Sequence, residues 1–417
     1  MIQAVRGTKD ILPDSVGSWQ FIEDVFRKVS KDYGYYELRT PIFEKTEVFS
    51  RGIGDATDIV NKEMYTFKDK GDESITLRPE MTAALVRSVI QNSMLQQSNT
   101  LRLWYFGPFF RYERPQKGRL RQFHQYGAEC LGSPYPEADA EVILLANSLF
   151  REAGIKDFNV LINSLGSDET RKKYKDELLK YLNSVSENLS KDSKERLQYN
   201  PLRILDSKDE NDKEALKNAP IILDYLDAES KEHFNKVIAT LEAENIKPII
   251  NPMLVRGLDY YCDTVFEFQS SLLGSQDSFG GGGRYNGLIE QLGGKPTPAV
   301  GFALGVERML LILEELNSLT ALNTNPTIFI VTTNPSLMNI SQNIAEVLRR
   351  KKISTLIDLQ QRTFKAQMRE ANRVSARYVV IVGEEEVQRN VINIKDMKTG
   401  EQKECPIDNL INFNFDF

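Results

Sequence analysis

The chain has 417 residues, enough for two or three domains with a full-sized hydrophobic core. Hydrophobic residues make up 41% of it and charged residues 27%, a balance that excludes an intrinsically disordered protein. The 53 Lys and Arg against 59 Asp and Glu give a net charge of −6, which argues against a protein that coats nucleic acid non-specifically. A local basic patch is still compatible with this balance.

Neither a membrane protein nor a secreted one is indicated. No run approaches the roughly 18 apolar residues that cross a membrane, and the N-terminal MIQAVRGTKDILPD lacks an apolar signal core. Three scattered cysteines fit neither a disulfide framework nor a four-ligand zinc site, and two histidines leave little for His-based catalysis. We predict a reduced, cytoplasmic protein without a structural metal, whose chemistry rests on carboxylates, arginines and glycine-rich backbone.

Residues 1–325 are predicted to form an α+β domain in which helices flank an antiparallel sheet. Apolar residues at helical spacing predict helices at 15–33, 80–96 and 137–154. Strands are expected at 101–107 (LRLWYFG) and 121–129 (RQFHQYGAE). Sequential strands with few crossover helices favour antiparallel pairing.

The later part of the chain changes character twice. From about 166 to 245 it is rich in Lys, Glu, Asp and Ser at helical spacing, which predicts a helical insertion. Strand patterns return at 253–268, and the polar stretch 319–327 is typical of a linker. Residues 326–417 then alternate strands and helices, which predicts a compact C-terminal α/β domain.

The segment RYERPQKGRLRQFHQYGAE at 111–129 concentrates arginines in a chain that is acidic overall. Taken alone, the cluster fits a solvated surface equally well. In a strand over 122–129, however, Phe123, Gln125 and Glu129 share one face and His124 takes the other. A ring, an amide and a carboxylate make a poor core, so we predict a pocket floor there and a structural role for His124.

Three further motifs each have two interpretations. FGGGGRYNG at 279–287 lacks the spacing of a phosphate loop, so it is a tight turn or a close approach of backbone to ligand. Arg308 falls in the first turn of a predicted helix, where the dipole disfavours a cation unless an anion or carboxylate is near. Glu80 opens another predicted helix, which it either caps or uses to present a ligand contact.

In this order, the motifs resemble those of the bacterial histidyl-tRNA synthetases, a family of class II aminoacyl-tRNA synthetases. Segments similar to the three class motifs are 15–33 with the strand into Pro41, 110–129, and PAVGFALGVER at 298–308. Segments similar to the amino-acid loop and the two histidyl strings are LRPEMT at 77–82, RGLDYYCDTVFEF at 256–268, and FGGGGRYNGL at 279–288. The resemblance covers nearly the whole chain and implies that 326–417 is an anticodon-binding domain.

The resemblance implies an enzyme that activates L-histidine with ATP, accompanied by Mg²⁺, and transfers it to the 3′ end of histidine tRNA. Phosphoryl transfer needs positioning and cations more than a nucleophilic side chain. Arg111 and Arg256 would be catalytic, at the α-phosphate and the attacking carboxylate. The other implied ATP contacts, from the triphosphate to the adenine, are Arg119, Arg308, Phe123 and Glu113.

The same resemblance implies a histidine pocket. The α-ammonium would be held by Glu80, Thr82 and Gln125, and the imidazole would be lined by Glu129, Tyr261 and Tyr285. A neutral imidazole has one donor and one acceptor, which a carboxylate and a phenol can satisfy. Many family members carry Gly where this chain has Met81. Cys262, beside the pocket, is interpreted as an inert buried thiol.

Implied partners are tRNA and a second copy of the chain. Gln116 and Arg121 would contact the acceptor end of tRNA. Trp19, Phe26 and the strand leading to Pro41 resemble the family's isologous interface, which implies a homodimer. Two alternatives stay open: a non-catalytic regulatory subunit of histidine biosynthesis, and a class II synthetase for another amino acid. For Arg256 the alternative is a structural ion pair with a carboxylate such as Asp259.

Overall fold

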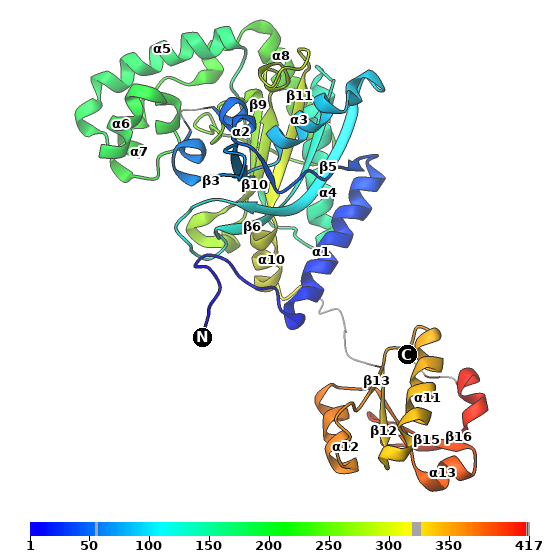
Figure 1. The fold of residues 1–417 in the computed structure, drawn as a ribbon. Coiled ribbons are helices and arrows are strands. Elements are labelled where there is room, and N and C mark those ends of the chain that lie inside the picture. Colours follow the sequence, from blue (N-terminus) through cyan, green and yellow to red (C-terminus); the bar gives the residue numbers. More distant parts are fainter. Residues whose placement is uncertain (55–56, 319–326, 414, 416–417) are drawn as a thin grey trace. The chain divides into compact units, whose positions relative to one another are not determined.

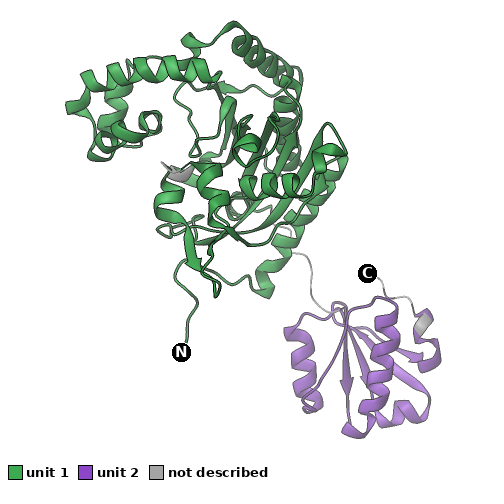
Figure 2. Ribbon diagram, turned by 45° about the horizontal axis from the view of Figure 1, so that its top comes forward, with its two compact units in different colours: residues 1–321 green, residues 322–417 purple. Residues whose placement is uncertain are grey.

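The computed structural model describes residues 1–54, 57–318, 327–413 and 415. The chain divides into two compact units, residues 1–321 and 322–417 (Figure 2). All but the last residue of the predicted linker, 319–327, lies outside the described residues. Each unit has its own sheet and core, so each is described by itself.

Among the described residues, an eight-stranded sheet forms the centre of the first unit (Figure 1). Its order is β1-β5-β6-β11-β10-β9-β7-β8, and the strands from β5 to β7 pair antiparallel, as predicted. The two edges depart from that prediction, because β1 pairs with β5 and β8 with β7 in parallel. The strands are β1 Tyr36–Glu37, β5 Leu101–Phe110, β6 Gln122–Leu131, β7 Asn159–Ser164, β8 Ile249–Ile250, β9 Cys262–Gln269, β10 Ser278–Arg284 and β11 Ala299–Gly305.

Side chains from opposite faces of this sheet enter two separate cores. One core joins the sheet to α1 Pro13–Asp32, α4 Pro136–Ala153, α8 Ala228–Ala243 and α10 Val306–Glu315. The other joins it to α2 Thr46–Ile53, α3 Thr82–Gln91, α5 Asp168–Ser184 and α9 Leu288–Gln291. The period of two along β6 separates them: Tyr126 and Ala128 enter the first core, and Leu131 the second.

The helices predicted at 15–33 and 137–154 form nearly as expected, as α1 and α4. Pro13 and Pro136 stand in their first turns, where the missing N–H has no helical partner to lose. The helix predicted at 80–96 is shorter, since α3 ends at Gln91 and Ser93 adopts a left-handed φ of 51°. A small sheet that the sequence did not indicate precedes it, with strands β2 Phe43–Lys45, β4 Ser74–Leu77 and β3 Tyr65–Lys68.

The region predicted as an insertion, 166–245, is largely helical. Besides α5 and α8 it contains α6 Lys191–Tyr199 and α7 Glu210–Leu216. Each of these helices begins at a capping side chain that accepts a backbone N–H two or three residues ahead: Ser167, Ser190, Asp209 and Asp227. The start of each helix is therefore set locally by its own sequence.

The second unit contains a mixed sheet in the order β13-β12-β14-β15-β16. Its parallel part, β13-β12-β14, follows the predicted alternation of strands and helices. The antiparallel part, β14-β15-β16, was not predicted. The elements are β12 Ile328–Thr332, α11 Met338–Arg350, β13 Thr355–Ile357, α12 Phe364–Arg373, β14 Tyr378–Val382, α13 Glu384–Gln388, β15 Val391–Asp396 and β16 Gln402–Pro406. No helix in the described part of either unit is long and apolar enough to cross a membrane.

Candidate active site

Most of the residues predicted to bind ligands converge on a cavity of about 340 Å³ in the first unit. Its floor is formed by the middle of the central sheet, and its walls come from the start of α3, the loop 111–121, the loop 256–261 and the start of α10. The predicted residues that line it are Glu80, Thr82, Arg111, Glu113, Arg119, Phe123, Gln125, Glu129, Arg256, Tyr261 and Arg308. Tyr285, Gln116 and Arg121 do not line it.

Strand β6 presents one row of side chains to this cavity. Phe123, Gln125 and Glu129 lie on its cavity face, in agreement with the predicted alternation. His124 contacts groups outside that row: its Nδ1 lies 3.0 Å from Glu307 Oε1, and the Trp19 ring meets it edge-on. Its backbone N–H also donates to the Glu307 carboxylate. These contacts fit the structural role predicted for His124.

Glu129 is a carboxylate only 1% exposed at one end of the cavity. The Thr82 hydroxyl donates to its Oε1 at 2.9 Å, and the Tyr285 hydroxyl donates to its Oε2 at 2.6 Å. Burial raises the pKa of Glu129 to about 8, although both hydroxyls oppose the shift. Gly301 lies opposite on β11, where a Cβ would be 1.6 Å from Oε2. Glycine is therefore required there to leave room for the carboxylate.

Glu80 and Gln125 line the same cavity, but only the Glu80 carboxylate has hydrogen-bond donors within the protein. Glu80 accepts the backbone N–H groups of Thr82 at 2.6 Å and Ala83 at 3.0 Å, so it does cap the start of α3. Gln125 Oε1 is buried and has no hydrogen-bond partner among the described residues. Because an unpaired buried acceptor is costly, Gln125 is suited to a donor supplied by a ligand.

Arginines approach the other end of the cavity from two segments. Arg111 donates through Nε to the Pro79 carbonyl at 2.9 Å, and its guanidinium carbon lies 5.2 Å from the Phe123 ring centroid. Arg308 donates to the backbone carbonyls of Gly118 and Ser278. These carbonyls leave its charge unneutralised, and burial together with nearby arginines lowers the pKa of Arg308. The predicted need for an anion near Arg308 therefore stands.

Arg119 forms an ion pair with Glu113, and Arg111 NH1 lies 3.9 Å from the same carboxylate. Glu113 is buried, whereas Arg119 is partly exposed on the loop. The two residues predicted to bind opposite ends of ATP thus form an ion pair with each other.

Arg256 also has an ionic partner in the structure. Its NH1 donates to Glu267 Oε2 at 2.7 Å, while its buried Nε has no hydrogen-bond partner among the described residues. The suggested pairing with Asp259 was wrong, because Asp259 instead accepts from Asn200 Nδ2 at 3.0 Å. Arg256 therefore combines one anchored nitrogen with one donor that is still free.

The two residues predicted to contact tRNA lie outside the cavity. Gln116 is exposed in a tight turn whose backbone pairs with Arg119. Arg121 is engaged within the protein: its backbone N–H donates to Gly7 O at 2.7 Å, and its guanidinium carbon lies 4.0 Å from the Tyr112 ring centroid. Arg121 therefore braces the loop 111–121 against the N-terminal segment.

Two family models match the chain in succession. The model described as histidyl-tRNA synthetase matches residues 7–309, well over half of the chain, and that of an anticodon-binding domain matches residues 327–414. The chain belongs to the histidyl-tRNA synthetase family.

Relatives agree with the family models along the full length. The chain is 48% identical over 410 residues to the histidine–tRNA ligase of Halothermothrix orenii, with 98% of each covered, and 46% identical over 417 residues to that of Staphylococcus haemolyticus, with 99% of each covered. The crystal structure of apo S. aureus histidyl-tRNA synthetase matches with a TM-score of 0.84 at 38% identity over 99% of each chain. These matches confirm the resemblance inferred from the motifs.

One solved structure bears on the regulatory alternative. A protein described as an ATP phosphoribosyltransferase regulatory subunit/histidyl-tRNA synthetase from Bacillus halodurans C matches with a TM-score of 0.66 at 22% identity, over 92% of this chain and 98% of that one. At this identity the match supports the fold alone. Full-length relatives named histidine–tRNA ligase favour a tRNA-charging enzyme over the regulatory subunit and over a synthetase for another amino acid.

Two tyrosines that line the cavity were not among the predicted site residues. Tyr105 on β5 and Tyr260 in the loop 256–261 are both buried, and burial raises the pKa of each, so their hydroxyls stay protonated. Tyr105 reaches past Gly127 of β6, where a Cβ would lie 2.2 Å from the ring. The strand at 101–107 was predicted. Its register against β6 directs Tyr105 to the cavity, and no local sequence pattern indicates that register.

Proposed function

We propose that this chain activates L-histidine with ATP to give histidyl-adenylate and transfers the histidyl group to the 3′-terminal ribose of histidine tRNA. The observation that carries the proposal is the two-ended cavity: Glu129, bonded by two hydroxyls, lies at one end, and arginines converge on the other. Such a cavity suits an amino acid with a hydrogen-bonding side chain next to a polyphosphate. The full-length relatives support the same reaction.

For histidine, we assign the α-ammonium to Glu80, Thr82 and Gln125. The unpaired Gln125 Oε1 accepts one ammonium N–H, and the Glu80 carboxylate, fixed by two backbone N–H groups, supplies the opposite charge. Glu129 accepts the imidazole N–H and the Tyr261 hydroxyl completes the ring's pocket, while Tyr285 acts from behind the lining by holding Glu129. A site built to pair a polar side chain rejects analogues that leave its buried groups unpaired.

For ATP, we assign Arg111 to the α-phosphate and Arg119 to the β- and γ-phosphates. Phe123 stacks on the adenine, Arg308 lies on the other face of the base and near the γ-phosphate, and Glu113 accepts from the adenine amino group. Arg119 and Glu113 pair with each other in the structure. Bound ATP would replace that ion pair with one contact at each end of the nucleotide.

The chemical step joins the two ends of the cavity. A histidine carboxylate oxygen attacks the α-phosphorus, the new P–O bond forms, and pyrophosphate leaves with the bonding electron pair. Arg256 faces the charge that develops, since its buried Nε is an unused donor while Glu267 holds its NH1. ATP would enter as its Mg²⁺ complex, in which the ion would neutralise part of the phosphate charge.

For tRNA, we assign the acceptor end to the loop that carries Gln116 and Arg121, and the anticodon to the second unit. The match of residues 327–414 to the anticodon-binding model supports the second assignment. The exposure of Gln116 supports the first, whereas the internal contacts of Arg121 give it a bracing role as well. The three cysteines are free and buried, in keeping with a reducing compartment such as the cytoplasm.

We also propose a homodimer, carried by the strand leading to Pro41 and not by Phe26. Phe26 is fully buried in its own core, with its ring centroid 4.4 Å from that of Tyr126, so it has no surface left for a partner. Exposed apolar side chains beside the edge strand β1 carry the proposal instead: Tyr36 is 76% exposed, Phe43 52% and Ile42 44%. Light scattering at micromolar concentration tests it, and a monomer would contradict it.

ATP–pyrophosphate exchange measured with each of the twenty amino acids tests the main proposal. We expect exchange with histidine alone, followed by charging of a histidine tRNA transcript. Absence of exchange with every amino acid would favour the regulatory alternative, and exchange with a different amino acid would overturn the substrate assignment.

A further inference from the structure

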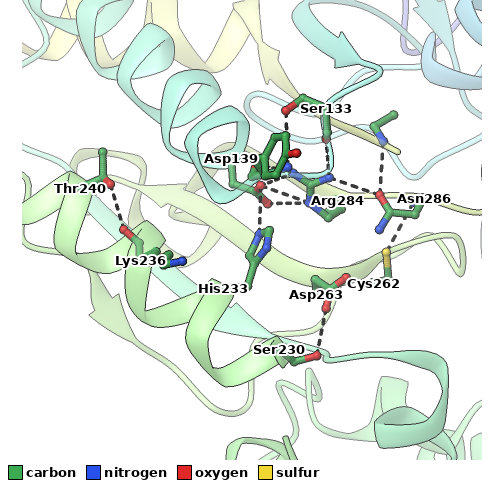
Figure 3. A network of polar contacts seen from close by, with 12 residues as sticks. Ser133, Asp139, Ser230, His233, Lys236, Thr240, Cys262, Asp263, Arg284 and Asn286 are labelled. Carbon is green, nitrogen blue, oxygen red and sulfur yellow. Dashed lines mark hydrogen bonds and ion pairs between the residues drawn. The ribbon is translucent and has the colours of Figure 1, made fainter. Parts of the chain in front are cut away.

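Arg284 and Tyr285 are neighbours in the glycine-rich segment, but their side chains serve different faces of the sheet. The Tyr285 hydroxyl bonds Glu129 at the cavity. Arg284, 1% exposed, points instead toward α4 and α8, where it meets Asp139 (Figure 3). The glycines before it follow the same alternation, since a Cβ at Gly283 would touch Tyr261 on the cavity side. Arg284 is therefore separated from any ligand in the cavity by the sheet itself.

All five N–H donors of the Arg284 guanidinium have an acceptor. Nε donates to the Asp139 carboxylate at 3.1 Å. NH1 donates to Ser133 O at 2.9 Å and to Asn286 Oδ1 at 3.3 Å, and NH2 donates to Tyr135 O at 3.1 Å and to Asp139 Oδ2. The guanidinium thus ties the end of β10 to the chain that leads into α4.

Asp139, the centre of this network, is fully buried and has a second donor. His233 on α8 places its Nε2 3.2 Å from Asp139 Oδ2. Burial alone would raise the pKa of Asp139, but the hydrogen bonds from His233 and Arg284 hold it below its usual value. The carboxylate therefore stays ionised and keeps its hold on the guanidinium.

The backbone of β10 needs such an anchor where Tyr285 begins. Its pairing with β9 shifts register between Gly283 and Arg284, so the regular ladder is interrupted one residue before the tyrosine. On the other side, the Tyr285 N–H donates to Ala299 O at 2.8 Å, and Asn286 Oδ1 accepts the Ala299 N–H as well as Arg284. Since a buried ion pair adds little net stability compared with apolar packing, its use here is better explained by geometry.

We propose that Arg284, held by Asp139 behind the sheet, is a positioning residue that fixes the Tyr285 hydroxyl against Glu129 and so sets the affinity for histidine. This inference rests on the proposed function. Arg284 acts only through Tyr285, and a change in its geometry shifts the phenol that holds Glu129 in the amino-acid pocket. Residues 284–286 do not line the cavity but bond to it through Glu129 at its amino-acid end, so the ATP end is unaffected.

Arg284→Lys tests the inference, because lysine keeps the charge beside Asp139 but not the five-donor fork. Exchange by the unaltered chain with histidine is measured first; its absence would refute the proposed function rather than this inference. We expect Arg284→Lys to raise the KM for histidine about tenfold, as for the loss of one hydrogen bond, and to change the KM for ATP less than about twofold. An equal rise in both KM values would overturn the inference.

A double-mutant cycle with Tyr285→Phe separates positioning from general damage. If Arg284 acts through the phenol hydroxyl, Arg284→Lys should change the KM for histidine less than about twofold once that hydroxyl is gone. The same tenfold rise in both backgrounds would overturn the inference. If Arg284→Lys lowers the melting temperature, the cycle is repeated with Asn286→Ala in its place. That variant removes one hydrogen-bond acceptor of Arg284 and leaves the arginine intact.

Arg102→Lys is the matched control. Arg102 on β5 pairs with Glu141, two residues beyond Asp139 on the same helix, through contacts of 2.7 and 3.0 Å. Its strand does not carry Tyr285. We expect the KM for histidine to stay within about twofold of the unaltered chain, and a rise matching that of Arg284→Lys would overturn the inference.

Discussion

The two faces of the central sheet each bury a carboxylate, and the two behave in opposite ways. Glu129 on the cavity face is 1% exposed and receives two neutral hydroxyls, and burial raises its pKa to about 8. Asp139 behind the sheet is 0% exposed and receives a guanidinium and an imidazole, and its pKa is held below the usual value. Burial is the same in both, so the partners decide the charge.

The difference matches what each face does. A neutral or easily neutralised Glu129 is stable without a ligand and is ready to accept the N–H of an incoming imidazole. The ionised Asp139 has its donors supplied by the fold, so it has nothing left to offer a ligand. The cavity face thus binds substrate, and the opposite face fixes the backbone that supports the cavity.

Asp139→Asn should produce the largest effect. It leaves the Arg284 guanidinium buried without its counter-ion, and we expect the free energy of unfolding at pH 7 to fall by about 3–5 kcal/mol. Because the folded pKa of Asp139 lies below its unfolded value, this stabilisation is present above about pH 4 and is lost as pH falls through the folded pKa. Urea denaturation across pH should show the gap between variant and parent closing only in acid; a gap that closes above pH 5 would contradict the ionised state.

Arg256→Ala, on the cavity face, should produce the next largest effect. Loss of a preorganised donor at the developing phosphate charge should slow adenylate formation by roughly 10²–10³-fold, or about 2.7–4 kcal/mol. Pre-steady-state pyrophosphate release measures this. If Arg256 only supports the fold through Glu267, adding Glu267→Gln to remove the orphaned carboxylate should restore both melting temperature and rate. We expect it to restore the melting temperature alone.

Local patterns predicted a good part of this arrangement. Alternation along 122–129 placed Phe123, Gln125 and Glu129 together, because the period of two in a strand is independent of the rest of the fold. The same principle put His124 on the other face. Apolar spacing likewise gave α1 and α4 to within two residues, since their first turns begin at prolines.

Contacts between segments that lie far apart along the chain could not be predicted from the sequence. Arg284 and Asp139 are 145 residues apart, and only the packing of α4 across β10 joins them. The alternative partner suggested for Arg256 was Asp259, but that carboxylate accepts from Asn200, and Glu267 pairs with Arg256 instead. Phe26 was assigned to an interface because its helix resembles the family's motif 1, but its ring packs on Tyr126 inside the core.

Glu129→Gln should reverse the sign seen at Asp139. The folded pKa of Glu129, about 8, lies above its unfolded value near 4.5, so its contribution to stability is fully present below about pH 4.5 and is lost as pH rises through 8. Glutamine does not titrate, so the variant should nearly equal the parent at pH 5 and exceed it by roughly 3–5 kcal/mol at pH 9, at about 1.4 kcal/mol per pH unit between the two pKa values. Thermal melts at the two pH values measure this, and parallel profiles would contradict the raised pKa.

His233→Ala should have the smallest effect and shows which partner holds Asp139. The variant removes one donor but leaves the guanidinium in place, so we expect a loss of about 1 kcal/mol, as for a single hydrogen bond. Asp139→Asn made in the His233→Ala background should then cost slightly less than in the parent, since the two residues share that bond. A loss from His233→Ala close to that of Asp139→Asn would mean that the imidazole, not the guanidinium, keeps the carboxylate ionised, and the contrast between the two faces would then rest on a different residue.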